Sequence, residues 1–204
     1  MPHPRPPYKP GYFYHIYNRG CHKMPLFHVH DDYIAALTKM RKYVLQFSLT
    51  LIAYCLMPNH YHFLIRQDAA FRAGLLPQRV FNSYSKKYNR RYNHSGTLFE
   101  DDYKVKLVDK TNYLHHLCRY IHANPVKDGL VRQPEDWIYS NYQEWMGLRN
   151  GKLVDKAFIS EHFTSSELYQ RYVADYIATK WLPSEINEYL IEWQAENNPS
   201  ATHP

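Results

Sequence analysis

The sequence predicts an α+β protein: a ferredoxin-like (split β-α-β) antiparallel sheet with helices on one face, plus a helical C-terminal extension. The first observation behind this prediction is the order in which strand-like and helix-like periodicities alternate, β-α-β-β-α-β followed by one more helix. The second is composition, because 45% of the 204 residues are hydrophobic, enough for one folded domain with a full core.

The first strand and helix are predicted between residues 12 and 47. Residues 12–17 are rich in aromatic and branched side chains, which favour a strand, and the turn-forming Asn18-Arg19-Gly20 ends it. A helix is expected to run to about Phe47, with apolar residues at helical spacing, and Asp31 or Asp32 is expected to cap its N-terminus.

A β-hairpin is predicted next. Residues 48–57 form an almost unbroken apolar run, which is typical of a central strand buried on both faces. Pro58-Asn59 predicts a tight connection, and residues 60–66 predict the second strand of the hairpin.

The last predicted elements of the sheet domain are a helix, a strand and a helix. Residues 75–94 are expected to be helical, and residues 99–108 to form a strand. Thr111 or Asn112 is then expected to cap a helix that ends near Ala123, because Pro125 disfavours a helical residue before it.

Charge divides the chain in two. Residues 155–204 hold eight acidic and three basic side chains, a net charge of −5, whereas residues 1–154 hold 22 basic and 11 acidic ones, a net charge of +11. A basic body favours a polyanionic partner, because binding releases the counterions condensed on that partner. We therefore divide the chain into a flexible N-terminal arm (1–10), a folded domain (11–150) and an acidic, mostly helical C-terminal extension (151–204).

Composition also argues against several classes of protein. The sequence contains no run of 18 apolar residues, which a membrane-spanning helix would need. The Pro-rich N-terminus lacks the apolar core of a signal peptide. Three widely spaced cysteines, Cys21, Cys55 and Cys118, predict small buried side chains in a reducing compartment rather than a disulfide framework or a zinc ribbon. These observations predict a cytoplasmic protein.

His60-Tyr61-His62 lies on a predicted strand. Because strand side chains alternate, His60 and His62 project from one face and Tyr61 from the other, so the two imidazoles can share one metal ion. The chain has 13 histidines, so such a pair also arises by chance, and a polar pair at a sheet surface is the alternative.

Tyr120 and Asn124 supply the second half of a candidate site. They lie four residues apart at the end of a predicted helix and therefore share a face. The amide oxygen of Asn124 offers a third, hard metal ligand, and the phenol of Tyr120 can reach a phosphate bound to that metal. Simple packing is the alternative for Tyr120, because the chain has 20 tyrosines.

Two stretches carry these four residues: Met57-Pro58-Asn59-His60-Tyr61-His62-Phe63-Leu64-Ile65 and Arg119-Tyr120-Ile121-His122-Ala123-Asn124-Pro125-Val126-Lys127-Asp128-Gly129-Leu130-Val131. Both resemble the REP-associated tyrosine transposases, which are single-tyrosine HUH transposases. Shorter segments fit the same pattern: Tyr14-His15-Ile16-Tyr17-Asn18-Arg19-Gly20, Gly96-Thr97-Leu98-Phe99, Tyr103-Lys104, and Pro134-Glu135-Asp136-Trp137 with Ser140. The resemblance spans residues 12–145 in one order, which makes it specific.

The resemblance implies a metal-dependent DNA-nicking enzyme. His60, His62 and Asn124 match the ligands of a divalent ion, Mg²⁺ or Mn²⁺, and Tyr120 matches the nucleophile. Members of the family cut single-stranded DNA, often next to a hairpin, through a 5′-phosphotyrosine link that frees a 3′-OH, so rejoining needs no ATP. We expect single-stranded or hairpin DNA as the partner, association with the bacterial nucleoid, and a monomer or a homodimer. By ligand chemistry alone, zinc, nickel or copper would suit two imidazoles and an amide at least as well.

The proton of the Tyr120 phenol needs an acceptor in such a reaction. A free tyrosine has a pKa near 10 and is mostly neutral at pH 7, while a metal ion can stabilise charge on the phosphate. Water, the metal's hydration shell, His116 or His122 could take the proton. For both histidines a surface or packing role is the alternative.

Basic residues on the second predicted helix are candidates for DNA contact. Lys86, Lys87, Arg90 and Arg91 lie among tyrosines four residues apart, and cations mixed with aromatic rings can follow a phosphate backbone and stack bases. The alternative is that the tyrosines form a buried stripe and the cations a solvated face. The resemblance adds two further candidates, Lys104 and Arg19.

The chain departs from the family at Glu100-Asp101-Asp102, where many members have a stretch rich in glutamine, glycine and arginine. Three carboxylates would repel DNA unless they point away, and one of them could instead assist the metal. The acidic extension also has two interpretations: it covers basic surface and restrains activity, as a C-terminal tail does in some relatives, or it is a packing appendage.

Three other functions remain to be separated from nicking through Tyr120. A DNA-binding regulator that no longer cuts has no need of all four site residues together. A metal-dependent phosphoesterase that uses water as its nucleophile has no need of Tyr120. A replication initiator or relaxase with the same chemistry is disfavoured by the short chain, which has no helicase domain.

Overall fold

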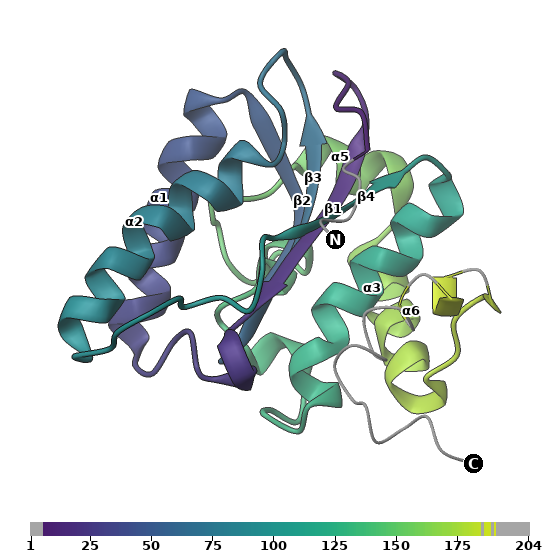
Figure 1. Cartoon of the computed structure of the whole chain (residues 1–204). Coiled ribbons are helices and arrows are strands. Elements are labelled where there is room, and N and C mark those ends of the chain that lie inside the picture. The colour runs from purple at the N-terminus through teal and green to yellow at the C-terminus, as the bar shows by residue number, and fades with distance from the viewer. Residues whose placement is uncertain (1–5, 185, 189, 191–204) are drawn as a thin grey trace.

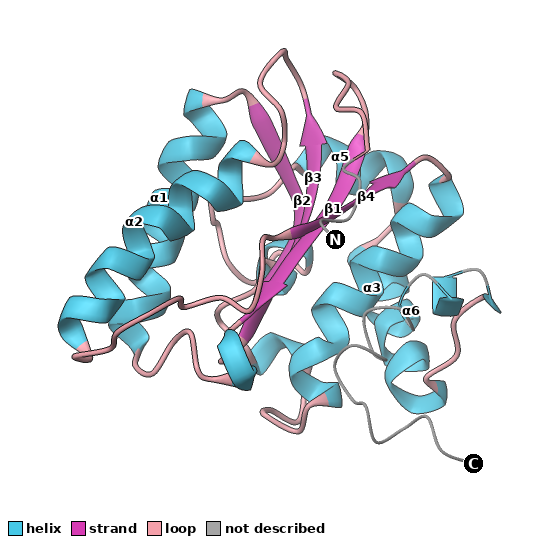
Figure 2. Cartoon of the chain, viewed as in Figure 1, coloured by secondary structure: helices cyan, strands magenta, loops and turns pink. Residues whose placement is uncertain are grey.

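The computed structural model describes residues 6–184, 186–188 and 190. Four strands form one antiparallel sheet in the order β2-β3-β1-β4; their bounds are β1 Phe13–Arg19, β2 Leu49–Leu56, β3 His60–Gln67 and β4 Lys104–Val108. The longer helices are α1 (His30–Gln46), α2 (Leu75–Arg91), α3 (Thr111–Lys127) and α6 (Ser166–Thr179) (Figure 2). Shorter ones are η1 (Cys21–Lys23), η2 (Pro134–Asp136), α4 (Tyr142–Trp145) and α5 (Lys156–His162). The predicted ferredoxin-like sheet is confirmed.

Helices cover both faces of this sheet. Helices α1 and α2, which connect strands within the split β-α-β arrangement, pack side by side on one face, as predicted (Figure 1). Helix α3 lies across the other face, where it contacts β2 and β3, and α6 packs on the outside of α3. The prediction placed helices on one face of the sheet, so the position of α3 on the second face departs from it.

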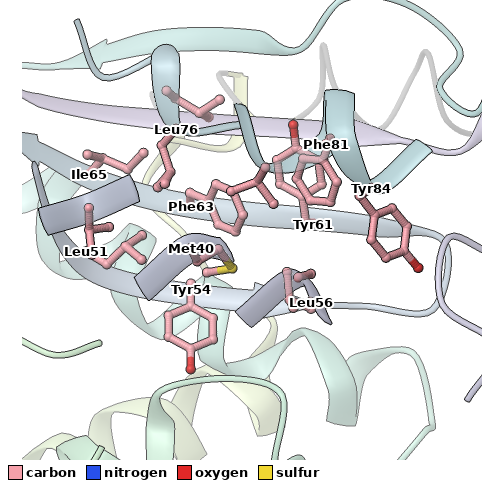
Figure 3. Close-up of a cluster of buried hydrophobic side chains, with 14 of the residues drawn as sticks. Met40, Leu51, Tyr54, Leu56, Tyr61, Phe63, Ile65, Leu76, Phe81 and Tyr84 are labelled. Carbon is pink, nitrogen blue, oxygen red and sulfur yellow. The ribbon is translucent and has the colours of Figure 1, made fainter. Parts of the chain in front are cut away.

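Strand alternation divides the interior into two cores. On the side of α1 and α2, Tyr61 and Phe63 of β3 stack against Phe81 of α2, with ring centroids 4.3 and 6.2 Å from that ring (Figure 3). On the side of α3, the alternate residues of β2 and β3, such as Ile52 and Leu64, belong to the second core. The uninterrupted apolar run of β2 is explained by burial on both faces, as predicted.

Helix α3 runs four residues further than predicted, to Lys127, and includes Pro125. Proline in a helix removes one backbone donor, but here only two residues of the helix follow it. Pro125 is buried, and its carbonyl accepts a hydrogen bond from the amide of Leu130 at 2.9 Å. Burial in the second core therefore outweighs the local tendency of Asn124-Pro125 to end the helix.

Two predicted N-caps and the start of one strand are corrected by the structure. Asp32 acts from the third position of α1, where its carboxylate accepts from the backbone amides of His28 and Val29 at 3.0 and 3.3 Å. Lys110, not Thr111 or Asn112, occupies the N-cap position of α3 and makes no side-chain cap. The strand predicted over 99–108 begins only at Lys104, because the preceding segment makes only an isolated bridge, from Phe99 to Gly20, the residue that follows β1.

The C-terminal extension is part of the second core. It buries large side chains against α3 and the sheet, namely Phe158, Tyr169, Val173, Tyr176, Leu182, Ile186 and Leu190. Arg119 of α3 is buried beneath it, with its guanidinium 4.2 Å from the ring centroid of Tyr172 and a 3.0 Å hydrogen bond to the carbonyl of Trp181. This packing is what the appendage interpretation predicts, and restraint of activity stays a prediction.

Several smaller expectations concern the ends of the chain and the cysteines. Residues 1–5 of the predicted arm and 191–204 of the extension lie outside the described residues, while the ring of Tyr8 packs 5.0 Å from that of Tyr14. The three cysteines are free thiols; Cys55 and Cys118 are buried, and Cys21 is only half-buried. Within the described part of the chain, no helix combines the length and the apolar character needed to cross a membrane.

Candidate active site

Strand β3 presents His60 and His62 on the face covered by α3. Tyr61 points to the opposite core, so the alternation expected from the sequence is confirmed. Both histidines are buried, and their ring centroids lie 5.2 Å apart with the rings at 84° to each other. Two imidazoles are therefore neighbours in a water-poor layer between sheet and helix.

Hydrogen bonding indicates which nitrogen of His60 would bind a metal. Its Nδ1 lies 2.7 Å from Oδ1 of Asn59, and since an amide oxygen only accepts, Nδ1 carries the hydrogen. The second nitrogen, Nε2, then bears the lone pair. Burial, aided by the nearby charge of Arg19, lowers the pKa of His60 to about 3, so the ring is neutral at physiological pH.

A third histidine, His15 of β1, contacts the pair. Its Nε2 lies 3.1 Å from Nδ1 of His62, and the two rings stack with centroids 5.2 Å apart. Burial lowers the pKa of His15 to about 3, with help from Lys106, and it lowers the pKa of His62 well below its usual range. The sequence analysis had included His15 in a matching segment without giving it a role.

Helix α3 brings Tyr120 to this layer. The Tyr120 side chain is fully buried, and its ring meets that of His62 edge to face with centroids 5.5 Å apart. Burial raises the pKa of the phenol well above 10, with further contributions from Tyr176, Asp128 and Tyr17 and an opposing one from a hydrogen bond with Asn124. The phenol is therefore neutral in this arrangement and must lose its proton during any attack.

Asn124 lies one helical turn after Tyr120. Its Nδ2 donates to the backbone carbonyl of Tyr120 at 2.8 Å, and the Asn124 side chain is buried. With the amide nitrogen turned to the helix, Oδ1 is the end of the side chain that can accept or coordinate. The predicted four-residue spacing on one face is confirmed because both residues lie within the continuous helix α3.

The residues present fit a divalent metal ion. Nε2 of His60, Nε2 of His62 and Oδ1 of Asn124 are neutral nitrogen and oxygen donors that would leave coordination positions for phosphate oxygens and water. No cluster of three histidine, cysteine or acidic side chains suited to a metal is found in the described part of the chain, so a third protein ligand for the histidine pair would have to be another kind of donor, such as the amide oxygen of Asn124.

Lys127 is a site residue that the sequence analysis missed. Its Nζ lies 4.8 Å from the ring centroid of Tyr120 and donates to the hydroxyl of Tyr176 at 2.8 Å. Burial lowers its pKa, although the neighbouring Asp128 works against this. Its position was available as a signal, because a residue seven after Tyr120 lies two helical turns along the same face.

The two histidines considered as proton acceptors have protein partners. Both nitrogens of His122 are engaged, Nδ1 with the Tyr169 hydroxyl at 2.6 Å and Nε2 with Oδ1 of Asn141 at 2.9 Å. Nδ1 of His116 lies 2.8 Å from the hydroxyl of Tyr172. These contacts join α3 to the extension and favour the packing interpretation for both residues.

The predicted DNA-binding cations fall into two groups. Arg19 and Lys104 lie on the face of the histidine pair: Arg19 is opposite His60 in the sheet register, and Lys104 is opposite Tyr17, which is itself opposite His62. Their role in DNA binding stays a prediction.

The second group lies on α2, on the other side of the sheet from the histidine pair, where its members are exposed: Lys86, Lys87, Arg90 and Arg91. Arg91 is paired with Asp32 at 3.1 Å. Tyr84 and Tyr88 are buried in the first core, so the stacking platform is wrong for these two rings, and the buried-stripe alternative holds.

The acidic run lies at the rim of the site. Glu100, Asp101 and Asp102 are exposed. The Glu100 carboxylate accepts from Nε of Arg19 at 3.0 Å, and the backbone carbonyl of Asp101 accepts from Nδ2 of Asn18 at 3.0 Å. Glu100 therefore neutralises a cation beside the histidine pair.

Comparisons with known proteins agree with the geometry. Residues 9–124 match the family model described as Transposase IS200 like. The chain is 27% identical over 123 residues to a protein of Haemophilus influenzae named as a REP-associated tyrosine transposase, a match that covers 54% of this chain and 69% of that protein. The fold is similar to a solved REP-associated tyrosine transposase bound to a REP hairpin, with a TM-score of 0.58 at 15% identity over 76% of this chain and 98% of the other.

Proposed function

Because the chain belongs to the IS200-like transposase family, we propose that it nicks and rejoins single-stranded DNA beside a hairpin through a phosphotyrosine formed on Tyr120. The observation that carries the proposal is the edge-to-face meeting of the Tyr120 and His62 rings, with centroids 5.5 Å apart. The REP hairpin bound by the solved neighbour is the model for the target, and the metal-binding roles of His60, His62 and Asn124 belong to the same proposal.

The chemistry exchanges one phosphodiester for another. Oη of Tyr120 attacks the scissile phosphorus and loses its proton to water, the bond from phosphorus to the 3′ oxygen breaks, and that oxygen takes up a proton. The number of phosphate ester bonds is unchanged, so the reverse reaction rejoins the strand without ATP. Mg²⁺ or Mn²⁺, when bound, would supply positive charge to the phosphate oxygens.

The surrounding residues prepare this exchange. His60 and His62 present neutral nitrogens, Asn124 is fixed by its bond to the Tyr120 carbonyl, and Lys127 places a cation 4.8 Å from the centre of the nucleophile's ring. The ammonium would stabilise charge that develops on the phenol oxygen and phosphate. One chain supplies all of these groups, which supports a monomer as the active unit.

The decisive experiment is formation of a covalent adduct. The full chain is incubated with hairpin-tipped single strands and Mn²⁺, and adducts are resolved on denaturing gels and mapped by mass spectrometry. We expect an adduct on Tyr120 that Tyr120→Phe abolishes and that Tyr113→Phe, a matched change on the same helix, leaves intact.

The alternatives give different results in the same assay. Binding without an adduct would identify a silent DNA-binding regulator. DNA cleavage that forms no adduct and continues in Tyr120→Phe would identify a phosphoesterase that uses water. Either outcome overturns the proposal.

A further inference from the structure

His15 contacts one of the candidate metal ligands directly from outside their set. It lies on β1, next to β3 in the sheet, and both His15 and His62 are fully buried. Nε2 of His15 is 3.1 Å from Nδ1 of His62, and the rings stack at an interplanar angle of 17°. Two nitrogens at this distance share one hydrogen, which either ring can supply.

The sharing of that hydrogen decides whether His62 can bind a metal through its other nitrogen. If His62 donates from Nδ1, its Nε2 carries a lone pair; if His15 donates from Nε2, the hydrogen of neutral His62 is on Nε2 and coordination there is blocked. The hydrogen bond made by one ring nitrogen thus sets which nitrogen can be metallated.

We propose that His15 is a positioning residue that accepts the Nδ1 hydrogen of His62 and so presents Nε2 of His62 to the metal, an inference that rests on the proposed function. Asn59 does the same for His60, since its Oδ1 lies 2.7 Å from Nδ1 of that ring. The two ligands are thereby held in matching tautomers by two different acceptors. His15 is not itself a ligand through Nε2, because that atom faces His62.

Burial makes His15 a dependable acceptor. The His15 ring is fully buried, and its Nε2 faces Nδ1 of His62 at 3.1 Å. A neutral ring with its hydrogen on Nδ1 keeps the lone pair of Nε2 available. An ammonium or guanidinium at this position could only donate and would force the wrong tautomer on His62.

The test compares two substitutions that differ in one property. His15→Gln keeps an acceptor, the amide oxygen, near the place of Nε2, whereas His15→Leu removes it. Mn²⁺ affinity is measured by calorimetry on the full chain without DNA, with His62→Ala as the reference for loss of the site. Outer-sphere partners of this kind typically contribute about 10- to 100-fold to metal affinity. We expect a loss of that size in His15→Leu and a smaller loss in His15→Gln.

A second measurement needs neither metal nor a variant that folds. Long-range ¹H–¹⁵N NMR of the metal-free wild-type protein reports the tautomer of each imidazole, and we expect His62 to be protonated at Nδ1. Protonation at Nε2, or unchanged Mn²⁺ affinity in His15→Leu, overturns the proposal.

Failure of this inference can be told from failure of the proposed function. An adduct on Tyr120 together with Mn²⁺ affinity that depends on His62 but not on His15 overturns the role of His15 alone. Absence of the adduct, with Mn²⁺ affinity that His62→Ala leaves unchanged, overturns both.

Discussion

Glu100 neutralises Arg19 beside the candidate site, so its replacement by glutamine is expected to strengthen DNA binding. Nε of Arg19 donates to the Glu100 carboxylate at 3.0 Å, and Arg19 lies opposite His60 in the sheet register. A phosphate that approaches this edge competes with the carboxylate for the same guanidinium. Glu100→Gln removes the competing charge and keeps the length of the side chain.

The expected gain follows from the exposure of the ion pair. The side chain of Glu100 is 43% exposed, and ion pairs of this kind contribute about 0.2–1 kcal/mol. Since about 1.4 kcal/mol corresponds to a tenfold change in affinity, Glu100→Gln should bind hairpin DNA roughly 1.4- to 5-fold more tightly. The gain should shrink as salt is raised, because added ions screen exposed charges.

Fluorescence anisotropy with a labelled hairpin-tipped strand, without metal, measures this change at low and high salt. Asp109→Asn is the matched control: it removes the same charge from an exposed residue that follows Val108, which lies opposite Phe13 at the other end of β1 from Arg19. A larger gain in Glu100→Gln supports DNA contact by Arg19. Equal gains would show a net-charge effect only, and no gain in either variant would refute the reasoning.

Three further predictions concern the extension, the cation and acid stability. Truncation after residue 152 should unfold the chain rather than activate it, because loss of the five buried aliphatic and phenylalanine side chains of the extension, at about 1.5–3 kcal/mol each, matches the total stability of about 5–15 kcal/mol. Circular dichroism and urea unfolding report this, and a folded, faster-nicking fragment would contradict it. Lys127→Met should slow adduct formation on Tyr120 about tenfold or more, because the charge that stabilises the reaction is lost. Lys127→Arg should restore part of the rate, and Tyr176→Phe, which removes the hydroxyl that the ammonium bonds to, should retain the rate. Single-turnover kinetics measure these rates, and equal rates in wild type and Lys127→Met would disprove the role. The pKa of His122 is lowered to about 4 from an ordinary value of 6.5, so the unfolded chain binds the proton first as the pH drops. The stability of the fold should therefore fall between about pH 6.5 and 4. Thermal unfolding should show a shallower fall of stability in His122→Gln, and an unchanged slope would refute the assignment.

Local pattern was enough to predict most of the sheet and the core of the site. The alternation of His60, Tyr61 and His62 follows from strand geometry, and the shared face of Tyr120 and Asn124 follows from helical spacing. Both features depend on neighbours in sequence, and both are present in the structure.

Features that depend on contacts between distant segments were not predictable in this way. Helix α3 continues through Pro125 because that residue is buried in the second core, which a local rule on proline does not include. The contact between His15 and His62 joins residues 47 positions apart, and that between Lys127 and Tyr176 joins residues 49 apart. Only the strand order and the docking of α6 bring these partners together.

The burial of Tyr120 limits access of a phosphate to its phenol oxygen. The phenol is fully buried, so a phosphate cannot reach its oxygen without movement of the residues that lie against it. Two of these are Lys127, the last residue of α3, and Tyr176 of α6. His60 and His62, in contrast, are held on the sheet by their contacts with Asn59 and His15. For the proposed reaction, movement at the junction of α3 and α6 would admit the DNA while the two imidazoles keep their tautomers. If Tyr120 is the nucleophile, as proposed above, the extension would take part in this movement even as a packing element, because the Tyr176 ring of α6 lies 6.3 Å from the ring of Tyr120.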